Sequence, residues 1–262
     1  MPHARHALRL PLAVALLLIL APLAVGCGSA KREDPILRLS AAEALAEGKE
    51  LMERGKYAQA RKLLTHAFEV EPNSESGREA LLLVADSLFL QGGSQNLIQA
   101  EAKYRDFLNR FPTSDRAPYV QYQIGRTLQQ RVERPDRDQS MTEQALTAYN
   151  ELLRLYPDSE YAEEARAQIG ELRQHLAQHE YLVARFYVRY GLPMAAVARL
   201  EQLLADYPDY PDKAKVYYHL GVAEAARGQA EEARKWFDRL RQEYPGSEYV
   251  AEIPTLREQG KG

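Results

Sequence analysis

Two histidines one helical turn apart come nearest, in this sequence, to the spacing of a chemical site. His175 and His179 are four residues apart, and Glu171 lies four residues before His175. On a helix these side chains share one face, and two imidazoles with a carboxylate can hold a divalent metal that activates water. A metal-dependent hydrolase would also need an enclosed pocket. The HExxH order, a glycine-rich phosphate loop and a GxSxG motif are absent from the sequence, so we expect no enzyme and no cofactor.

Cys27, the only cysteine, follows an N-terminal segment typical of a secretory signal. Residues 1–9 carry two arginines and no acid, and residues 10–26 form an uncharged run. That run is shorter than the roughly 20 apolar residues of a spanning helix. The segment LAVGC at 23–27 resembles the lipobox of bacterial lipoproteins, whose cysteine is acylated, for example with palmitate. A coincidental cysteine behind an ordinary signal peptide is the alternative.

We therefore expect a signal peptide at 1–26, a lipidated linker at 27–39 anchored by Cys27, and a folded body at 40–262. The resemblance to lipoproteins of the enteric type also implies export to the outer membrane, because Gly28 stands where an aspartate would retain the protein at the inner membrane.

The composition describes a well-packed, soluble body. Hydrophobic residues make up 45% of the chain and charged residues 27%, which excludes a wholly disordered chain and a polytopic membrane protein. The formal net charge is -3, and basic residues are interleaved with acidic ones. Nucleic acid is therefore not an expected partner.

A five-fold spacing of alanine and proline organises this body. In each block a proline follows an alanine by 12 residues, and large apolar residues stand four and seven positions after the alanine. The pairs are Ala60 and Pro72, Ala100 and Pro112, Ala145 and Pro157, Ala196 and Pro208, and Ala233 and Pro245. This pattern predicts an amphipathic helix that ends before each proline, and the serine two residues after four of the prolines is suited to cap the next helix.

A second helix is expected before each of these helices, which gives an all-α fold. Gly48, Ala184 and Gly221 lie 12 residues before their alanines, where a small side chain lets two antiparallel helices touch. The pattern is that of the tetratricopeptide repeat, so we predict one solenoid of about five helix-turn-helix repeats. The repeats fall near 41–74, 77–114, 116–159, 177–210 and 214–247, with an extra helix near 160–176.

Residues 136–210 carry motifs beyond the generic repeat. They include Arg137-Asp138, Tyr156-Pro157-x-Ser159-x-Tyr161, Val183-Ala184-x-x-Tyr187, Ala195-Ala196-x-x-Arg199-x-Glu201 and Tyr207-Pro208-Asp209. In this combination the segment resembles the BamD family, lipoproteins of the β-barrel assembly machinery of the Gram-negative outer membrane. The resemblance implies a protein on the periplasmic face of that membrane. It would bind the POTRA domains of the barrel-forming subunit BamA, accompany other Bam lipoproteins, and assist assembly and insertion of unfolded barrel precursors.

Two sets of candidate binding residues follow from the repeat positions and from this resemblance. The resemblance implies that the C-terminal repeats take the POTRA partner, with Arg199 matching a family arginine at that contact. We assign to this side Arg185, Arg189, Arg199, Glu201 and Tyr218. The first helices of the earlier repeats would form a groove for an extended peptide, lined by Leu45, Lys49, Met52, Leu82, Asp86, Phe89, Tyr119, Tyr122 and Arg126. Tyrosine and arginine suit protein interfaces, although ordinary packing between helices also uses tyrosine.

Two other functions remain open at this point. The first is a different periplasmic tetratricopeptide adaptor lipoprotein, which coordinates the cell envelope or assembles pili. The second is the metal-dependent hydrolase built on Glu171, His175 and His179.

Overall fold

The computed structural model describes residues 34–255, and every regular element in that range is helical. The chain divides into two compact units, Met1–Arg38 and Leu39–Gly262. Of the first unit only the 3-10 helix η2 (Pro35–Arg38) is described. Cys27 and the expected signal peptide lie outside the described residues.

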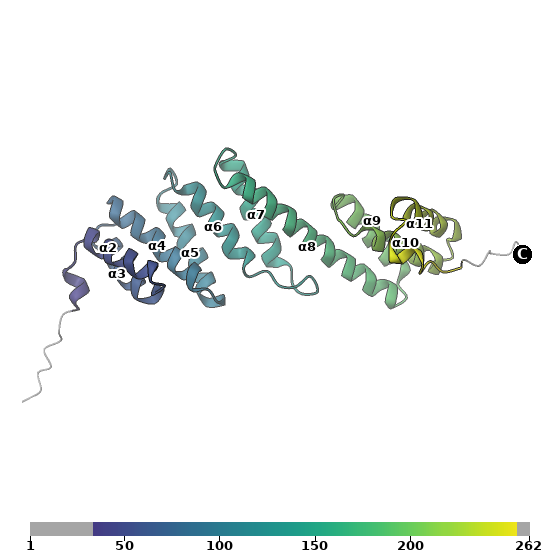
Figure 1. The fold of residues 1–262 in the computed structure, drawn as a ribbon, viewed down its shortest axis with the longest axis horizontal. Coiled ribbons are helices and arrows are strands. Elements are labelled where there is room, and N and C mark those ends of the chain that lie inside the picture. Colours follow the sequence, from purple (N-terminus) through teal and green to yellow (C-terminus); the bar gives the residue numbers. More distant parts are fainter. Residues whose placement is uncertain (1–33, 256–262) are drawn as a thin grey trace, which may run out of the picture. The chain divides into compact units, whose positions relative to one another are not determined.

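The described part of the second unit, residues 39–255, contains ten α-helices and one short 3-10 helix (Figure 1). They are α2 (Ala41–Glu53), α3 (Tyr57–Val70), α4 (Glu75–Gln91), α5 (Ser94–Arg110), α6 (Ala117–Gln129), α7 (Ser140–Leu155), α8 (Ala162–Arg189), α9 (Pro193–Asp206), α10 (Lys213–Ala226), α11 (Ala230–Glu243) and η3 (Glu248–Val250). Each helix packs against the next, and the predicted repeats appear as the pairs α2 with α3, α4 with α5, α6 with α7, and α10 with α11. The all-α prediction is confirmed.

The fourth repeat differs from the prediction. The extra helix expected near 160–176 is not separate, because α8 runs without a break from Ala162 to Arg189 and includes the first helix of repeat four. No proline interrupts these 28 residues, and Gly170 alone is too weak a breaker to end a helix. The two buried apolar clusters of the unit meet on this helix: Leu172 belongs to the first and Ala177 to the second.

Small residues on the first helix of a repeat set its distance from the second helix. A Cβ atom added at Gly221 would lie 2.4 Å from the ring of Phe237, and one added at Gly48 would lie 2.7 Å from Leu64. A Cβ atom added at Gly125 would likewise lie 2.6 Å from the ring of Tyr149. The sequence pattern missed Gly125, because the long connection between α6 and α7 puts it 20 rather than 12 residues before Ala145.

Glycine turns and serine caps join the helices, and the caps agree in part with the prediction. The turns between the two helices of repeats one, four and five contain Gly55, Gly191 and Gly228, which adopt positive φ angles of 69°, 70° and 77°. Ser74 caps α4, accepting a hydrogen bond from the Gly77 amide at 3.0 Å. The expectation fails for two serines: α6 and α8 begin two residues later than it requires, at caps Arg116 and Tyr161, and the buried hydroxyl of Ser159 has no partner among the described residues.

A carboxylate ties the second repeat to the third. Asp86 of α4 accepts hydrogen bonds from the hydroxyls of Tyr104 of α5, at 2.6 Å, and Tyr119 of α6, at 3.0 Å. The side-chain amide of Gln123 donates to the Tyr119 hydroxyl at 2.7 Å. Burial raises the pKa of the Asp86 carboxyl, and the two tyrosine hydroxyls and Arg116 offset part of that shift.

The close contact at Gly221 predicts opposite effects for two glycine substitutions. Gly221→Ala should lower the free energy of unfolding by about 1 to 3 kcal/mol, because the new methyl group overlaps Phe237. Gly170→Ala, within α8, is the matched control: its Cβ meets nothing within 4 Å, so it should stabilise the protein by about 0.5 to 1 kcal/mol. Denaturant unfolding measures both changes. Equal stabilisation by the two substitutions would contradict the assigned contact.

The raised pKa of Asp86 predicts a pH dependence of stability that Asp86→Asn removes. The folded protein holds this proton more tightly than the unfolded chain, whose aspartate pKa is about 3.9. Its contribution to the free energy of unfolding therefore falls as pH rises from the unfolded pKa through the folded one, and is constant above it. Unfolding measured across this window should give a difference between the two proteins that changes with pH. Parallel profiles would show that the carboxylate is not held as described.

Candidate partner-binding surfaces

One histidine of the pair, His179, contacts the loop between α6 and α7. Nδ1 of His179 donates a hydrogen bond to the carbonyl oxygen of Pro135 at 2.7 Å, which holds the connection between α6 and α7 against α8. His175 keeps a buried Nε2 atom without a hydrogen-bond partner among the described residues, and burial lowers its pKa. In residues 34–255, no group of three or more His, Cys, Asp and Glu side chains is placed to hold a metal ion.

Four residues assigned to the peptide groove pack into the core. Leu45, Leu82, Phe89 and Tyr122 are at most 7% exposed, so little of their surface is left for a peptide. The apolar stripe of a first helix serves both the core and a groove, and its pattern alone does not separate the two. Lys49 reaches solvent but forms an ion pair with Glu79 at 2.7 Å. Met52 and Asp86 are partly buried.

Tyrosine and arginine gather on α6 beside the start of α8. The ring of Tyr161 lies 5.1 Å from Tyr122 and 5.8 Å from Tyr119, centroid to centroid. The exposed guanidinium of Arg126 lies 4.9 Å from the ring centroid of Phe89. Next to them is an open pocket of about 340 Å³, lined by Tyr122, Arg126, Gln129, Gln130, Tyr149, Glu164 and Gln168. Its amide, hydroxyl and guanidinium groups can pair with the backbone of an extended peptide.

A larger pocket, of about 650 Å³, lies where α4 approaches the turn between α5 and α6, and sequence reasoning missed it. Arg78, Arg110 and Arg116 line it together with Glu75, Glu79 and Asp115. The guanidinium of Arg78 lies 5.9 Å from the ring centroid of Phe111. Phe111 and Pro112, whose pattern in the sequence predicts only the end of a helix, also line this pocket.

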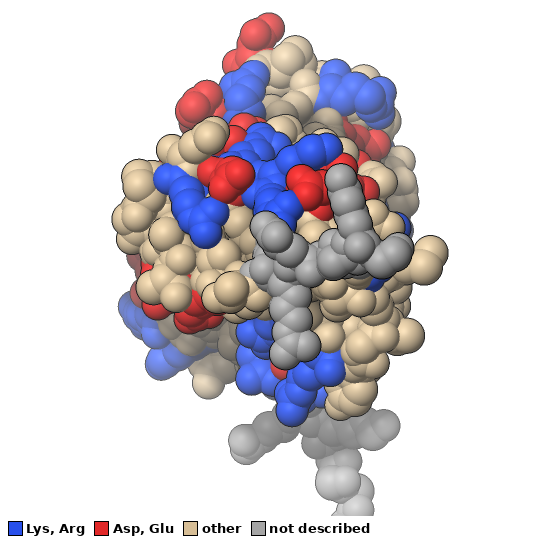
Figure 2. Space-filling model, turned by 90° about the vertical axis from the view of Figure 1, so that its right-hand side faces the viewer, with Lys and Arg blue, Asp and Glu red and all other residues tan. Residues whose placement is uncertain are grey.

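The residues assigned to the C-terminal side lie on α8, α9 and α10. Nη1 of Arg199 lies 2.7 Å from Oε2 of Glu180, and the two side chains are 47% and 29% exposed. The ring of Tyr218 packs against Tyr249 at 5.2 Å between centroids. Arg185 and Arg189 are exposed near the end of α8. Figure 2 shows basic and acidic side chains intermixed on one face of the molecule.

Glu201 lines a pocket of about 410 Å³ that the sequence did not reveal. Its other walls are Leu204, Ala205, Pro208, Lys213, Tyr217, Trp236 and Arg239. The guanidinium of Arg239 lies 4.7 Å from the ring centroid of Tyr217 and 5.7 Å from that of Trp236. Trp236 is the only tryptophan of the chain, and an aromatic side chain beside an arginine is the composition of interface hot spots. In the sequence, this single tryptophan was the only feature that could have indicated the pocket.

Comparison with known proteins covers most of the chain. The family YfiO, described as outer membrane lipoprotein, matches residues 38–216, and a tetratricopeptide repeat family matches residues 187–253. Two proteins named outer membrane protein assembly factor BamD are similar to the chain at 26% identity. The one from Rickettsia prowazekii aligns over 90% of this chain and 92% of its own length, and the one from Caulobacter vibrioides over 93% and 79%.

None of the described helices has the length and apolar content needed to cross a membrane. The family match extends over more than half of the chain and includes the segment 136–210, whose motifs predicted it. The chain belongs to the outer membrane lipoprotein family YfiO, is related to BamD, and folds as a tetratricopeptide-repeat solenoid.

Proposed function

We propose that the chain is a scaffold anchored to the outer membrane on its periplasmic face, where it binds the POTRA domains of the barrel-forming subunit and assists the assembly and insertion of β-barrel proteins. The observation that carries the proposal is the likeness to BamD of Rickettsia prowazekii, an outer membrane protein assembly factor, over nearly the full length of both chains. A scaffold needs binding surfaces rather than a reaction centre. The described surfaces are rich in tyrosine and arginine, as protein interfaces are.

Acylated Cys27 is the proposed anchor. Several acyl chains on one residue hold a protein to a bilayer durably, because each buried methylene contributes about 0.8 kcal/mol and one chain alone binds only reversibly. The linker from Gly28 to Leu39 spans at most about 40 Å when extended, at ~3.3 Å per residue. The solenoid would therefore work close to the membrane surface.

Arg199 is the proposed contact of the C-terminal repeats with the POTRA partner. Its guanidinium is half-exposed on α9, away from the buried Ala196 and Leu200. It is held by Glu180 of α8, so a partner carboxylate would share or replace this acid. Because Glu180 stays beside it, the arginine is already oriented when the partner arrives, which lowers the entropy cost of pairing.

The first three repeats are the proposed site for an unfolded precursor. Of the residues assigned to the groove, Lys49, Met52, Tyr119 and Arg126 retain exposed or half-buried side chains. The pocket beside Arg126 adds further amides and hydroxyls. These groups suit a chain in extended conformation, whose backbone carbonyls and amides need partners at regular spacing.

Arg199→Glu should weaken POTRA binding while leaving peptide binding by the first repeats unchanged. Loss of a charge pair at an interface typically costs about 2 to 5 kcal/mol, or ~30-fold to several-thousand-fold in affinity. The charge-swapped variant Arg199→Glu/Glu180→Arg restores the internal ion pair, so it should keep the wild-type thermal melt and still fail to bind. Arg154→Glu, on the exposed face of α7, is the control and should bind normally.

The separation of the two binding sites is tested by measuring the affinity of each variant for the POTRA partner and for an extended barrel-terminal peptide. Recovery of POTRA binding in the charge-swapped variant would show that Arg199 acts only through Glu180. Equal loss of both ligands would contradict separate sites.

A further inference from the structure

Exposed large apolar side chains gather at one turn of the solenoid. Phe186, Tyr190, Leu192 and Met194 fall within nine consecutive residues and are between 50% and 72% exposed. Elsewhere in the described range, exposed large apolar side chains stand singly along the sequence, as at Val70 and Ile98. We call these four side chains the apolar tip. Their concentration requires an explanation that scattered surface residues do not.

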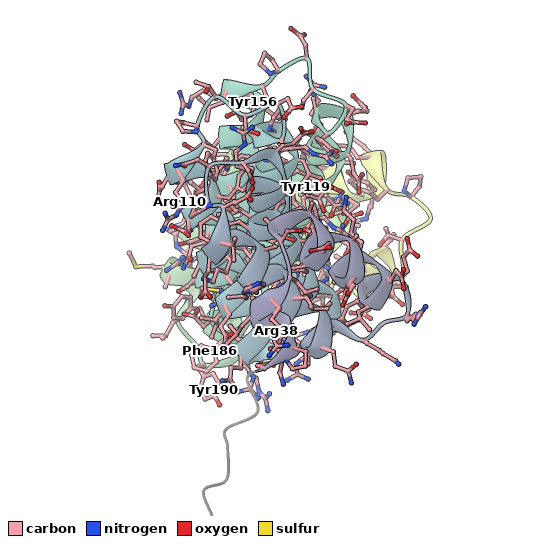
Figure 3. The ribbon with its side chains drawn as sticks, turned by 90° about the vertical axis from the view of Figure 1, so that its left-hand side faces the viewer. Arg38, Arg110, Tyr119, Tyr156, Phe186 and Tyr190 are labelled. Carbon is pink, nitrogen blue, oxygen red and sulfur yellow. The ribbon has the colours of Figure 1, made fainter. Side chains whose placement is uncertain are left out.

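A backbone hydrogen bond closes the turn that carries the apolar tip. Gly191 takes a φ angle of 70°, and the amide of Leu192 donates to the Tyr187 carbonyl oxygen at 2.9 Å, which closes the end of α8. Pro193 then begins α9. The rings of Phe186 and Tyr190 lie 4.3 Å apart, centroid to centroid. Figure 3 shows these two rings side by side at an edge of the molecule. The apolar surface is therefore prearranged.

The apolar tip projects at a turn and does not line a pocket. None of its four residues belongs to the walls of the pockets of about 340, 410 and 650 Å³ described above. A surface that receives a peptide is normally concave, with a pocket for each anchoring side chain. The side chains of the tip stand at a turn and are at least 50% exposed, which suits insertion into a deformable medium.

The chain segment that carries the tip holds charges of one sign. Residues 181–200 contain three arginines and no acidic residue, although the whole chain carries a net charge of -3. Arg199 is paired with Glu180, whereas Arg185 and Arg189 form no ion pair within the described residues. The Arg185 guanidinium lies 6.0 Å from the ring centroid of Tyr181. Two exposed arginines that form no ion pair within the described residues thus flank the apolar tip in the sequence.

We propose that the apolar tip inserts into the interface of a phospholipid bilayer that contains anionic lipids. Phe186, Leu192 and Met194 would enter the boundary between headgroups and acyl chains, where apolar area is removed from water. The hydroxyl of Tyr190 would stay at headgroup depth, as interfacial tyrosines do. Arg185 and Arg189 would lie on lipid phosphates, because an anionic surface attracts basic side chains that lie near it.

This contact would give the solenoid a second attachment, on α8 and α9, besides the proposed lipid at Cys27. Two attachments fix the orientation of a body that one tether leaves free to rotate. The inference rests on the membrane placement of the proposed function, but not on its POTRA partner. A failure of POTRA binding would leave it intact.

A single label tests the insertion on the full mature chain. Cys27 is the only native cysteine, so Met194→Cys introduces one new thiol for an environment-sensitive fluorophore. Ile98→Cys is the matched control, because Ile98 is also apolar and 54% exposed but stands alone on α5. The parent chain, treated identically, gives the background from Cys27. The proteins are reconstituted in phosphatidylethanolamine and phosphatidylglycerol vesicles that carry a nitroxide-labelled lipid as quencher.

We expect a blue-shifted emission and severalfold stronger quenching at position 194 than at position 98. Arg185→Gln/Arg189→Gln in the Met194→Cys background should reduce the quenching, as should vesicles without phosphatidylglycerol. Thermal melts of all variants check the fold. Equal quenching at the two positions would overturn the proposal. Shielding at position 194 that appears only when the purified barrel subunit is added would also overturn it, and would assign the tip to a protein interface.

Discussion

The distance between the two helices of a repeat is the constraint on which the rest of this structure depends. Where Gly48, Gly125 and Gly221 face Leu64, Tyr149 and Phe237, the backbone of one helix touches the large side chain of the next, with no room for a methyl group. The apolar stripes are then buried within a layer two helices thick. Each repeat covers its neighbour, and polar side chains remain for the outer surfaces.

Function follows from what this packing leaves exposed. The core takes half of the aromatic residues of the first helices, so the proposed binding surfaces consist of arginines, amides and a few rings at the edges of repeats. For example, Arg126 and Trp236 each line a pocket, and Arg199 forms an ion pair with Glu180. Between the second and third repeats, the single carboxylate of Asp86 accepts hydrogen bonds from two tyrosine hydroxyls that belong to different helices.

Sequence patterns predicted the paired helices, because these depend on local spacing. They failed where a contact spans a variable connection. Gly125 was missed because the loop before α7 lengthens its repeat, and the continuity of α8 was missed because a repeat boundary was assumed where no residue breaks the helix. The apolar pattern of the helix assigned Leu82 and Phe89 to the peptide groove, but both side chains are buried in the core. Glu180 beside Arg199 is a contact between two helices that spacing along one helix does not reveal.

The central claim is that this solenoid serves a β-barrel assembly machine. Affinity purification of the tagged, full-length chain from detergent-solubilised envelope, followed by identification of the recovered proteins, tests it most directly. The account predicts recovery of a barrel protein with POTRA domains, in an amount comparable to that of the chain itself. Recovery of the intact chain without such a protein, or with pilus or cell-wall components in its place, would contradict the account.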